Sequence, residues 1–118
     1  MPLREYIIND IEPVKLDETI KDVQLLFSNL TYSHIPIQQD KVYLGCISEA
    51  DAHCLDSTKP LSEYQFTLEG FFVRRKTSWL DVLEALAKSD ANIMPVLDQN
   101  NKNLLYNELS DILSMFSG

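Results

Sequence analysis

The chain has 118 residues, and 10 Lys and Arg against 18 Asp and Glu give a formal net charge of −8. This length suits one domain with a core that folds without disulfide bonds, and two cysteines are too few for the disulfide framework of a secreted protein. The acidic excess disfavours a nucleic-acid polymer as a partner, and no stretch approaches the roughly 20 apolar residues of a membrane span.

The first predicted helix begins after Thr19. Thr19 and Asp22 have the spacing of a capping box, in which each side chain bonds the backbone N–H of the other residue. Ile20, Val23 and Phe27 then form the apolar stripe of a helix that faces a core.

A strand, a turn, a second strand and a helix follow in the first half. The strand covers residues 34–37 and contains Pro36, so we expect it at a sheet edge or with the proline nitrogen directed away from its partner. Turn residues 39–41 and the apolar segment 42–44 predict a hairpin, and a helix is expected from about Glu49 to Leu55.

The second half repeats these signals 59 residues later. Ser78 and Asp81 correspond to Thr19 and Asp22, and Pro95, within the apolar segment 93–96, corresponds to Pro36. Turn residues 98–101, a strand at 103–106 and a helix over 109–116 complete the predicted copy. One inserted residue in that turn makes Asp111 the counterpart of Asp51.

A turn-rich stretch that begins at residue 56 separates the copies. It predicts a short helix at residues 61–64, which ends before Gly70. We therefore expect a first repeat over residues 1–56, a linker over 57–68 and a second repeat over 69–118. Neither half has enough residues to close a core alone, so the copies are expected to pack about a pseudo-twofold axis.

Three features together resemble a cystathionine-β-synthase (CBS) domain. They are the helix that begins after Thr19, the apolar-Pro-apolar strand and the segment Gly45-Cys46-Ile47-Ser48-Glu49-Ala50-Asp51. Two in tandem resemble a Bateman module, from about Ile11 to Phe116. The resemblance implies an α+β fold, an α/β sandwich of two βαββα repeats. It also implies a cleft for adenosine-containing ligands such as AMP, ADP, ATP, NAD or S-adenosylmethionine, a sensing role without catalysis, and no required cofactor.

The resemblance also implies a set of ligand-binding residues. Ser48 and Asp51 match the family's hydroxyl and its ribose-binding carboxylate, which is chemically suited because an ionised Asp accepts from both ribose hydroxyls. The other expected adenosyl contacts, most of them apolar and suited to a flat purine, are Val14, His34, Ile35, Pro36, Ile37, Ile47, Met94, Pro95 and Asp111.

The second half departs from this signature. Leu105 replaces the glycine, Asn107 the β-branched residue and Glu108 the hydroxyl residue, so Asp111 alone remains under the predicted alignment. Two carboxylates beside a phosphate would repel it. We therefore expect asymmetric occupancy that favours the site around Ser48 and Asp51.

The expected phosphate partners are Arg74, Arg75 and Lys76, which come directly before the second predicted helix. Alternative interpretations stay open for each candidate. Ser48 and Asp51 also have the spacing of a plain helix N-cap, and the basic cluster is also typical of a solvated strand edge. His34 also fits a hydrogen-bonded surface or core residue.

Metal binding and catalysis are disfavoured. Cys46, His53, Cys54 and His34 lack the spacing of a zinc site, and nothing in the sequence marks an activated Cys-His pair. Cys46 within a strand is better interpreted as a small apolar core residue. Glu49, Asp51 and Asp56 are spread over different helix faces, which disfavours an acid–base pair.

We therefore expect a regulatory module that binds an adenosyl ligand between its repeats and signals to a protein partner. Residues Leu25, Leu26 and Phe27 are more apolar than one core stripe needs, which predicts association, most simply as a homodimer. The alternative is a dimerisation or adaptor module whose clefts no longer bind a ligand. Arg4, Glu5 and Asp10 interrupt any signal-peptide pattern, so a cytoplasmic location without membrane contact is expected.

Overall fold

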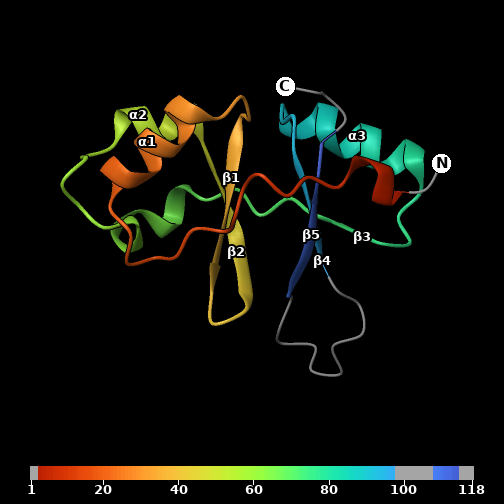
Figure 1. Cartoon of the computed structure of the whole chain (residues 1–118), viewed down its shortest axis with the longest axis horizontal. Helices are drawn as coiled ribbons and strands as arrows, with labels where there is room; N and C mark the ends of the chain where they lie inside the picture. The colour runs from red at the N-terminus through yellow and green to blue at the C-terminus, as the bar shows by residue number, and fades with distance from the viewer. Residues whose placement is uncertain (1–2, 98–107, 115–118) are drawn as a thin grey trace.

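The computed structural model describes residues 3–97 and 108–114, and Figure 1 shows them as two lobes side by side. One lobe contains α1 (Ile20–Asn29), β1 (His34–Gln39), β2 (Val42–Ser48) and α2 (Glu49–Cys54). The other contains β3 (Val73–Arg74), α3 (Trp79–Ser89), β4 (Met94–Leu97) and β5 (Leu109–Leu113). Two 3₁₀ segments, η1 (Leu3–Tyr6) and η2 (Leu61–Thr67), complete this α+β architecture, which confirms the predicted fold class.

The two long helices begin where the sequence predicts. Thr19 Oγ1 accepts from the Asp22 N–H at 3.2 Å, and Asp22 Oδ2 accepts in return from the Thr19 N–H, so the capping box of α1 is complete. Ser78 Oγ accepts from the Asp81 N–H at 3.3 Å at the start of α3. Helices α1 and α3 therefore both begin with a hydroxyl N-cap.

The predicted hairpin of the first half is confirmed. β1 and β2 pair antiparallel, with Pro36 opposite Cys46, and the two connecting residues Asp40 and Lys41 both have positive φ, as a tight hairpin turn requires. Gly45 has φ +129°, and a Cβ there would lie 3.0 Å from the Glu69 carbonyl oxygen. The glycine is needed at this position because the backbone of residue 69 approaches β2 so closely.

The predicted helix over residues 109–116 is wrong, because residues Leu109–Leu113 form β5, antiparallel to β4. Pro95 lies opposite Ile112 as Pro36 lies opposite Cys46, and Cys46 and Ile112 are 66 residues apart, whereas the prolines are 59 apart. By this register Asp111 corresponds to Gly45, so the predicted match of Asp111 with Asp51 is also wrong. Pairing with β4 overrides the local helix signal.

The register also identifies Ser114 as the counterpart of Ser48. The error arose in the connection between β4 and β5, which is longer than the two-residue turn of the first half. The predicted turn at 98–101 and the predicted strand at 103–106 lie outside the described residues.

The prolines do not lie at sheet edges. β4 is the middle strand of β3-β4-β5, and β1 has Val14 on the side opposite β2. The Pro36 carbonyl oxygen accepts from the Val14 N–H at 3.0 Å, so the Pro36 nitrogen also faces the Val14 side and no ladder bond to β2 is lost. The second expectation, a nitrogen directed away from the hairpin partner, therefore holds for Pro36.

Equivalent residues of the two halves meet at the centre of the molecule. Ser33 and Asn92, 59 residues apart, exchange two bonds: the Ser33 N–H donates to Asn92 Oδ1 at 2.7 Å, and the Asn92 N–H donates to Ser33 Oγ at 3.0 Å. Corresponding residues that contact each other reciprocally lie on a twofold axis. The parallel pairs Val14 with Ile37 and Val73 with Val96 show the same offset of 59, which supports the predicted internal twofold.

Each sheet receives its outer segment from the part of the chain that precedes the other half. Residue Ile7 pairs with Leu113 of the second sheet, and Glu69 pairs with Cys46 of the first. The core is built accordingly: one buried cluster centres on α1 and the first sheet, and a second on α3 and the second sheet. Within residues 3–97 and 108–114, no helix is long and apolar enough to cross a membrane.

Replacing Asn92 with alanine is expected to lower the free energy of unfolding by about 1–3 kcal/mol, because it removes the acceptor of the Ser33 N–H and the donor to the Thr31 carbonyl. Urea unfolding followed by circular dichroism measures this loss. Asn29→Ala is the matched control, since Asn29 is exposed and its side chain donates to the Leu25 carbonyl within α1. Equal losses in both variants would contradict a special role for the contact on the axis.

Candidate functional site

A pocket of about 550 Å³ opens beside the internal twofold. Three segments line it: residues 31–34 before and at the start of β1, residues 48–51 at the junction of β2 and α2, and Ser89, Asp90 and Asn92 at the end of α3. Glu69, from the segment that pairs with β2, completes the lining. Both halves of the chain therefore form this pocket.

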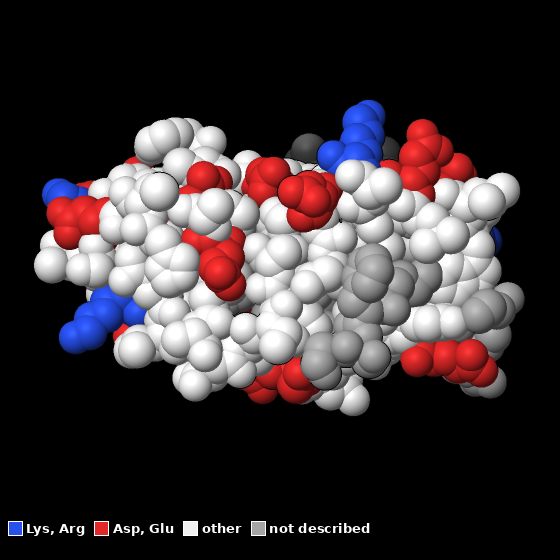
Figure 2. All heavy atoms as spheres, turned by 90° about the horizontal axis from the view of Figure 1, so that it is seen from above, with Lys and Arg blue, Asp and Glu red and all other residues white. Residues whose placement is uncertain are grey.

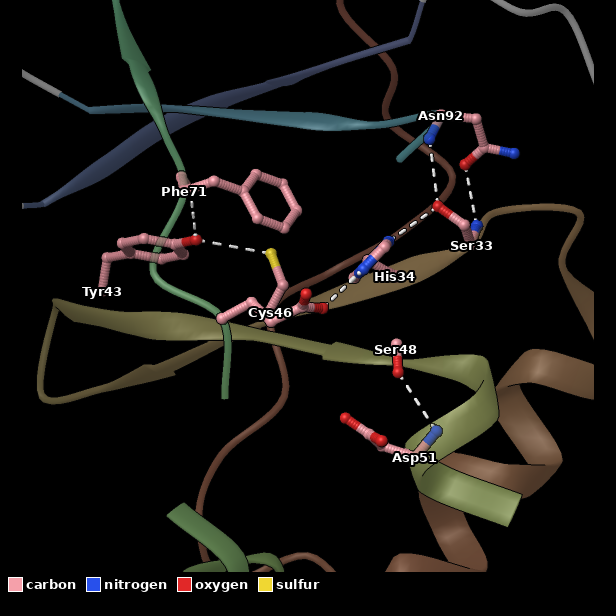
Figure 3. A network of polar contacts seen from close by, with 9 residues as sticks. Ser33, His34, Tyr43, Cys46, Ser48, Asp51, Phe71 and Asn92 are labelled. Atoms are coloured by element: carbon pink, nitrogen blue, oxygen red, sulfur yellow. Dashed lines mark hydrogen bonds and ion pairs between the residues drawn. The ribbon is translucent and has the colours of Figure 1, made fainter. Parts of the chain in front are cut away.

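Ser48 and Asp51 lie together in the pocket, as the sequence predicts. Ser48 is the N-cap of α2, and its Oγ accepts from the Asp51 N–H at 3.1 Å, so the structural interpretation of this spacing is confirmed (Figure 3). No hydrogen bond or ion pair to the Asp51 carboxylate is found among the described residues, and the side chain is partly exposed. The carboxylate is thus free to accept hydrogen bonds from a ligand.

His34 joins the pocket to the contact on the twofold axis. Its Nδ1 lies 2.7 Å from Ser33 Oγ, and its Nε2 lies 2.8 Å from Glu69 Oε2 (Figure 3). Because Ser33 Oγ accepts from the Asn92 N–H, the serine hydroxyl can donate to Nδ1, which places the histidine proton on Nε2, facing Glu69. The alternative interpretation of His34 as a hydrogen-bonded residue is confirmed, and its 4% exposure shows that it is buried.

The apolar candidates are buried in the two cores and are not part of the pocket lining. They are Val14, Ile35, Pro36, Ile37, Ile47, Met94 and Pro95. Their strands carry the polar pocket residues: β1 begins at His34 and β2 ends at Ser48. Direct contact of these apolar side chains with a ligand stays a prediction.

Asp111 and the basic cluster meet at a different place. Arg75 Nη2 donates to Asp111 Oδ2 at 2.6 Å, beside a smaller pocket of about 350 Å³ that Asp111 lines. The Arg74 guanidinium lies 5.3 Å from the centre of the Phe72 ring, and Lys76 is exposed. None of the three basic residues lines the pocket of Ser48 and Asp51, and their role as phosphate partners stays a prediction.

The cysteine in β2 is a core residue. Cys46 is fully buried, and its Sγ lies 3.4 Å from the Tyr43 hydroxyl, which donates to the Phe71 carbonyl at 2.6 Å. Burial raises the pKa of the Cys46 thiol to about 12, so the group is protonated at neutral pH and a poor nucleophile. In the described part of the chain, no three His, Cys, Asp or Glu side chains gather as a metal site requires.

The pocket is acidic. Four of its lining residues carry carboxylates, namely Glu49, Asp51, Glu69 and Asp90, and none of the described lining residues is Lys or Arg. Figure 2 shows acidic side chains gathered over the middle of this face, with a basic side chain at the edge of the group. The sequence did not identify Glu69, Asp90 or Asn92 as site residues, because only the exchange of outer segments and the twofold contact bring them to Ser48 and Asp51.

Solved structures with the same fold identify this architecture. A CBS domain pair/ACT domain protein from Thermotoga maritima matches with a TM-score of 0.77 at 14% identity, over 98% of this chain and 90% of that one. The CBS domains of a transcriptional regulator from Streptococcus pneumoniae match with a TM-score of 0.75 at 17% identity, over 97% and 92%. This chain has the fold of a CBS domain pair.

A third CBS structure is that of a bacterial CNNM/CorC family Mg²⁺ transporter in complex with ATP, with a TM-score of 0.68 at 15% identity, over 98% of this chain and 82% of that one. No family model matches the sequence, and no curated protein is similar enough to count as a relative. The CBS-pair fold accounts for the internal twofold and for a pocket formed by both repeats.

Proposed function

We propose that this CBS pair is a regulatory module that binds an adenosyl compound in the pocket of Ser48 and Asp51. The main support for this proposal is the Asp51 carboxylate, which has no partner among the described residues. The backbone of Asp51 is held in place because its N–H donates to Ser48 Oγ, the N-cap of α2. Such a carboxylate can accept hydrogen bonds from both hydroxyl groups of a ribose. The ATP complex of the transporter CBS domain supports the choice of an adenosine-containing ligand.

Regulation follows from the position of the pocket. A ligand there contacts residues 31–34 and 48–51 of the first repeat and Asp90 and Asn92 of the second. Binding therefore favours the arrangement of the repeats in which both sets of contacts form. The proposed role needs no catalytic group, and the buried, protonated Cys46 offers no nucleophile.

The signal is proposed to pass through a second copy of the chain or another protein. Exposed apolar side chains stand on both long helices, with Leu25 and Leu26 on α1 and Leu80 and Leu83 on α3. Leu80 is 79% exposed and Leu25 is 54% exposed, although both are large apolar residues. Such exposure is typical of helix faces that pack against a partner.

Adenosine is expected to raise the melting temperature. A ligand at 100 times its Kd adds about 2.7 kcal/mol to the free energy of unfolding. With an unfolding entropy of about 2.1 cal/mol/K per residue, this corresponds to a shift of about 10 °C. Differential scanning fluorimetry with adenosine, AMP, ADP, ATP, NAD and S-adenosylmethionine measures it, with guanosine as the control for the base.

The alternative function, an adaptor without a ligand, predicts a different outcome. If no adenosine compound shifts the melting temperature by more than about 1 °C at millimolar concentration, the binding proposal is wrong. A shift of the same size with guanosine would contradict recognition of the adenine base.

A further inference from the structure

We infer that the pocket selects adenosyl compounds that carry positive charge and no phosphate. The inference rests on the proposed function, because it assigns a ligand class to the same pocket. Four carboxylates line the pocket, and the described lining residues include no Lys or Arg to offset them. A phosphate would enter this field against repulsion, whereas an ammonium or sulfonium group would be attracted.

Two backbone amides at the start of α2, those of Glu49 and Asp51, are not free to bind a phosphate. The Glu49 N–H donates to the Ser33 carbonyl at 2.9 Å, and the Asp51 N–H donates to Ser48 Oγ at 3.1 Å. These amides are therefore already bonded within the protein. The side chains of Glu49 and Asp51 also place negative charge in the first turn, where a phosphate would otherwise be stabilised.

The Arg74 and Arg75 side chains, which were expected to bind phosphate, are directed elsewhere. Arg75 pairs with Asp111 at 2.6 Å, beside the smaller pocket, and Arg74 stacks on Phe72. Within the acidic pocket, His34 is the one basic side chain of the described lining, and its Nε2 is bonded to Glu69. The pocket thus keeps most of its negative charge for the ligand.

The carboxylates are dispersed around the pocket and do not form a chelating group. In residues 3–97 and 108–114, no three acidic or other metal-binding side chains lie close enough to hold an ion. Glu49 and Asp51 come from α2, Glu69 from the segment beside β2, and Asp90 from the end of α3. All four carboxylates can attract a positively charged group on an organic ligand. They do not lie close enough together to coordinate one metal ion.

One pair of probes isolates the charge. S-adenosylmethionine differs from S-adenosylhomocysteine by one methyl group on sulfur, which makes that sulfur a positively charged sulfonium. Isothermal titration of the full chain is expected to give a Kd for S-adenosylmethionine about 10-fold lower, and no measurable binding of ATP with or without Mg²⁺. The ratio is expected to fall at high salt, because screening weakens charge interactions.

Replacing one carboxylate of the pocket tests whether the pocket causes the preference for S-adenosylmethionine. Asp90→Asn removes one carboxylate and keeps the left-handed backbone at φ 51°, which Asn also adopts readily. It is expected to reduce the ratio of the two Kd values by about threefold. Asp17→Asn, at an exposed position outside the pocket, is the matched control and is expected to leave the ratio unchanged.

Neutral adenosine separates failure of this inference from failure of the proposed function. If adenosine binds but S-adenosylmethionine and S-adenosylhomocysteine have equal Kd values, the charge selectivity is wrong and the adenosyl site stands. If ATP binds as tightly as S-adenosylmethionine, the inference is overturned as well. If no adenosine compound binds, adenosine included, the proposed function itself fails.

Discussion

Asp51→Ala is expected to weaken adenosine binding by about 10- to 100-fold, which corresponds to about 1.5–3 kcal/mol for hydrogen bonds to a charged group. The Asp51 carboxylate lines the pocket, and α2 fixes its position through the bond from the Asp51 N–H to Ser48 Oγ. Alanine keeps this backbone bond and removes only the acceptor. Isothermal titration with adenosine measures the change in Kd, and circular dichroism checks that α2 is retained.

Asp111→Ala is the matched control for this prediction. Asp111 pairs with Arg75, which is 65% exposed, and it does not line the pocket of Ser48 and Asp51. Its replacement is expected to leave the Kd for adenosine within about twofold and to cost about 0–1 kcal/mol of stability, as for a surface ion pair. Equal losses of affinity in the two variants would show that the ribose is not bound at Asp51.

Phe27→Ala is expected to lower the free energy of unfolding by about 3–5 kcal/mol. The Phe27 ring is 3% exposed and lies in the cluster that joins α1 to the first sheet. Its removal takes away apolar burial and leaves a cavity. For 118 residues this corresponds to a fall in melting temperature of about 12–20 °C, which calorimetry measures.

Leu25→Ala on the same helix is the matched control. Leu25 is 54% exposed, and alanine has the higher helix propensity, so its stability is expected to change by no more than about 0.5 kcal/mol. A similar loss in both variants would mean that the exposed face of α1 is buried in solution. Sedimentation at several protein concentrations would then identify a second copy of the chain as the covering partner.

Local signals were sufficient to predict much of this fold. The hydroxyl-acid spacing at Thr19 and Ser78 predicts the starts of α1 and α3, and turn residues 39–41 predict the first hairpin, because these structures depend on bonds within a few residues. Repetition at an offset of 59 extended these local signals to a prediction of paired CBS-like repeats. Ser48 and Asp51 were identified as ligand residues through the resemblance to a CBS domain, whereas their local spacing by itself predicted only the N-cap of α2.

Long-range pairing decided what these signals could not. Residues 109–113 have a helix-like pattern, yet antiparallel pairing with β4 makes them a strand and moves Asp111 to the position of Gly45. Glu69, Asp90 and Asn92 reach the pocket through contacts between segments far apart in the chain. The net charge of −8 is a property of the amino-acid sequence, but four of the 18 acidic side chains line one pocket only because the two repeats pack on each other.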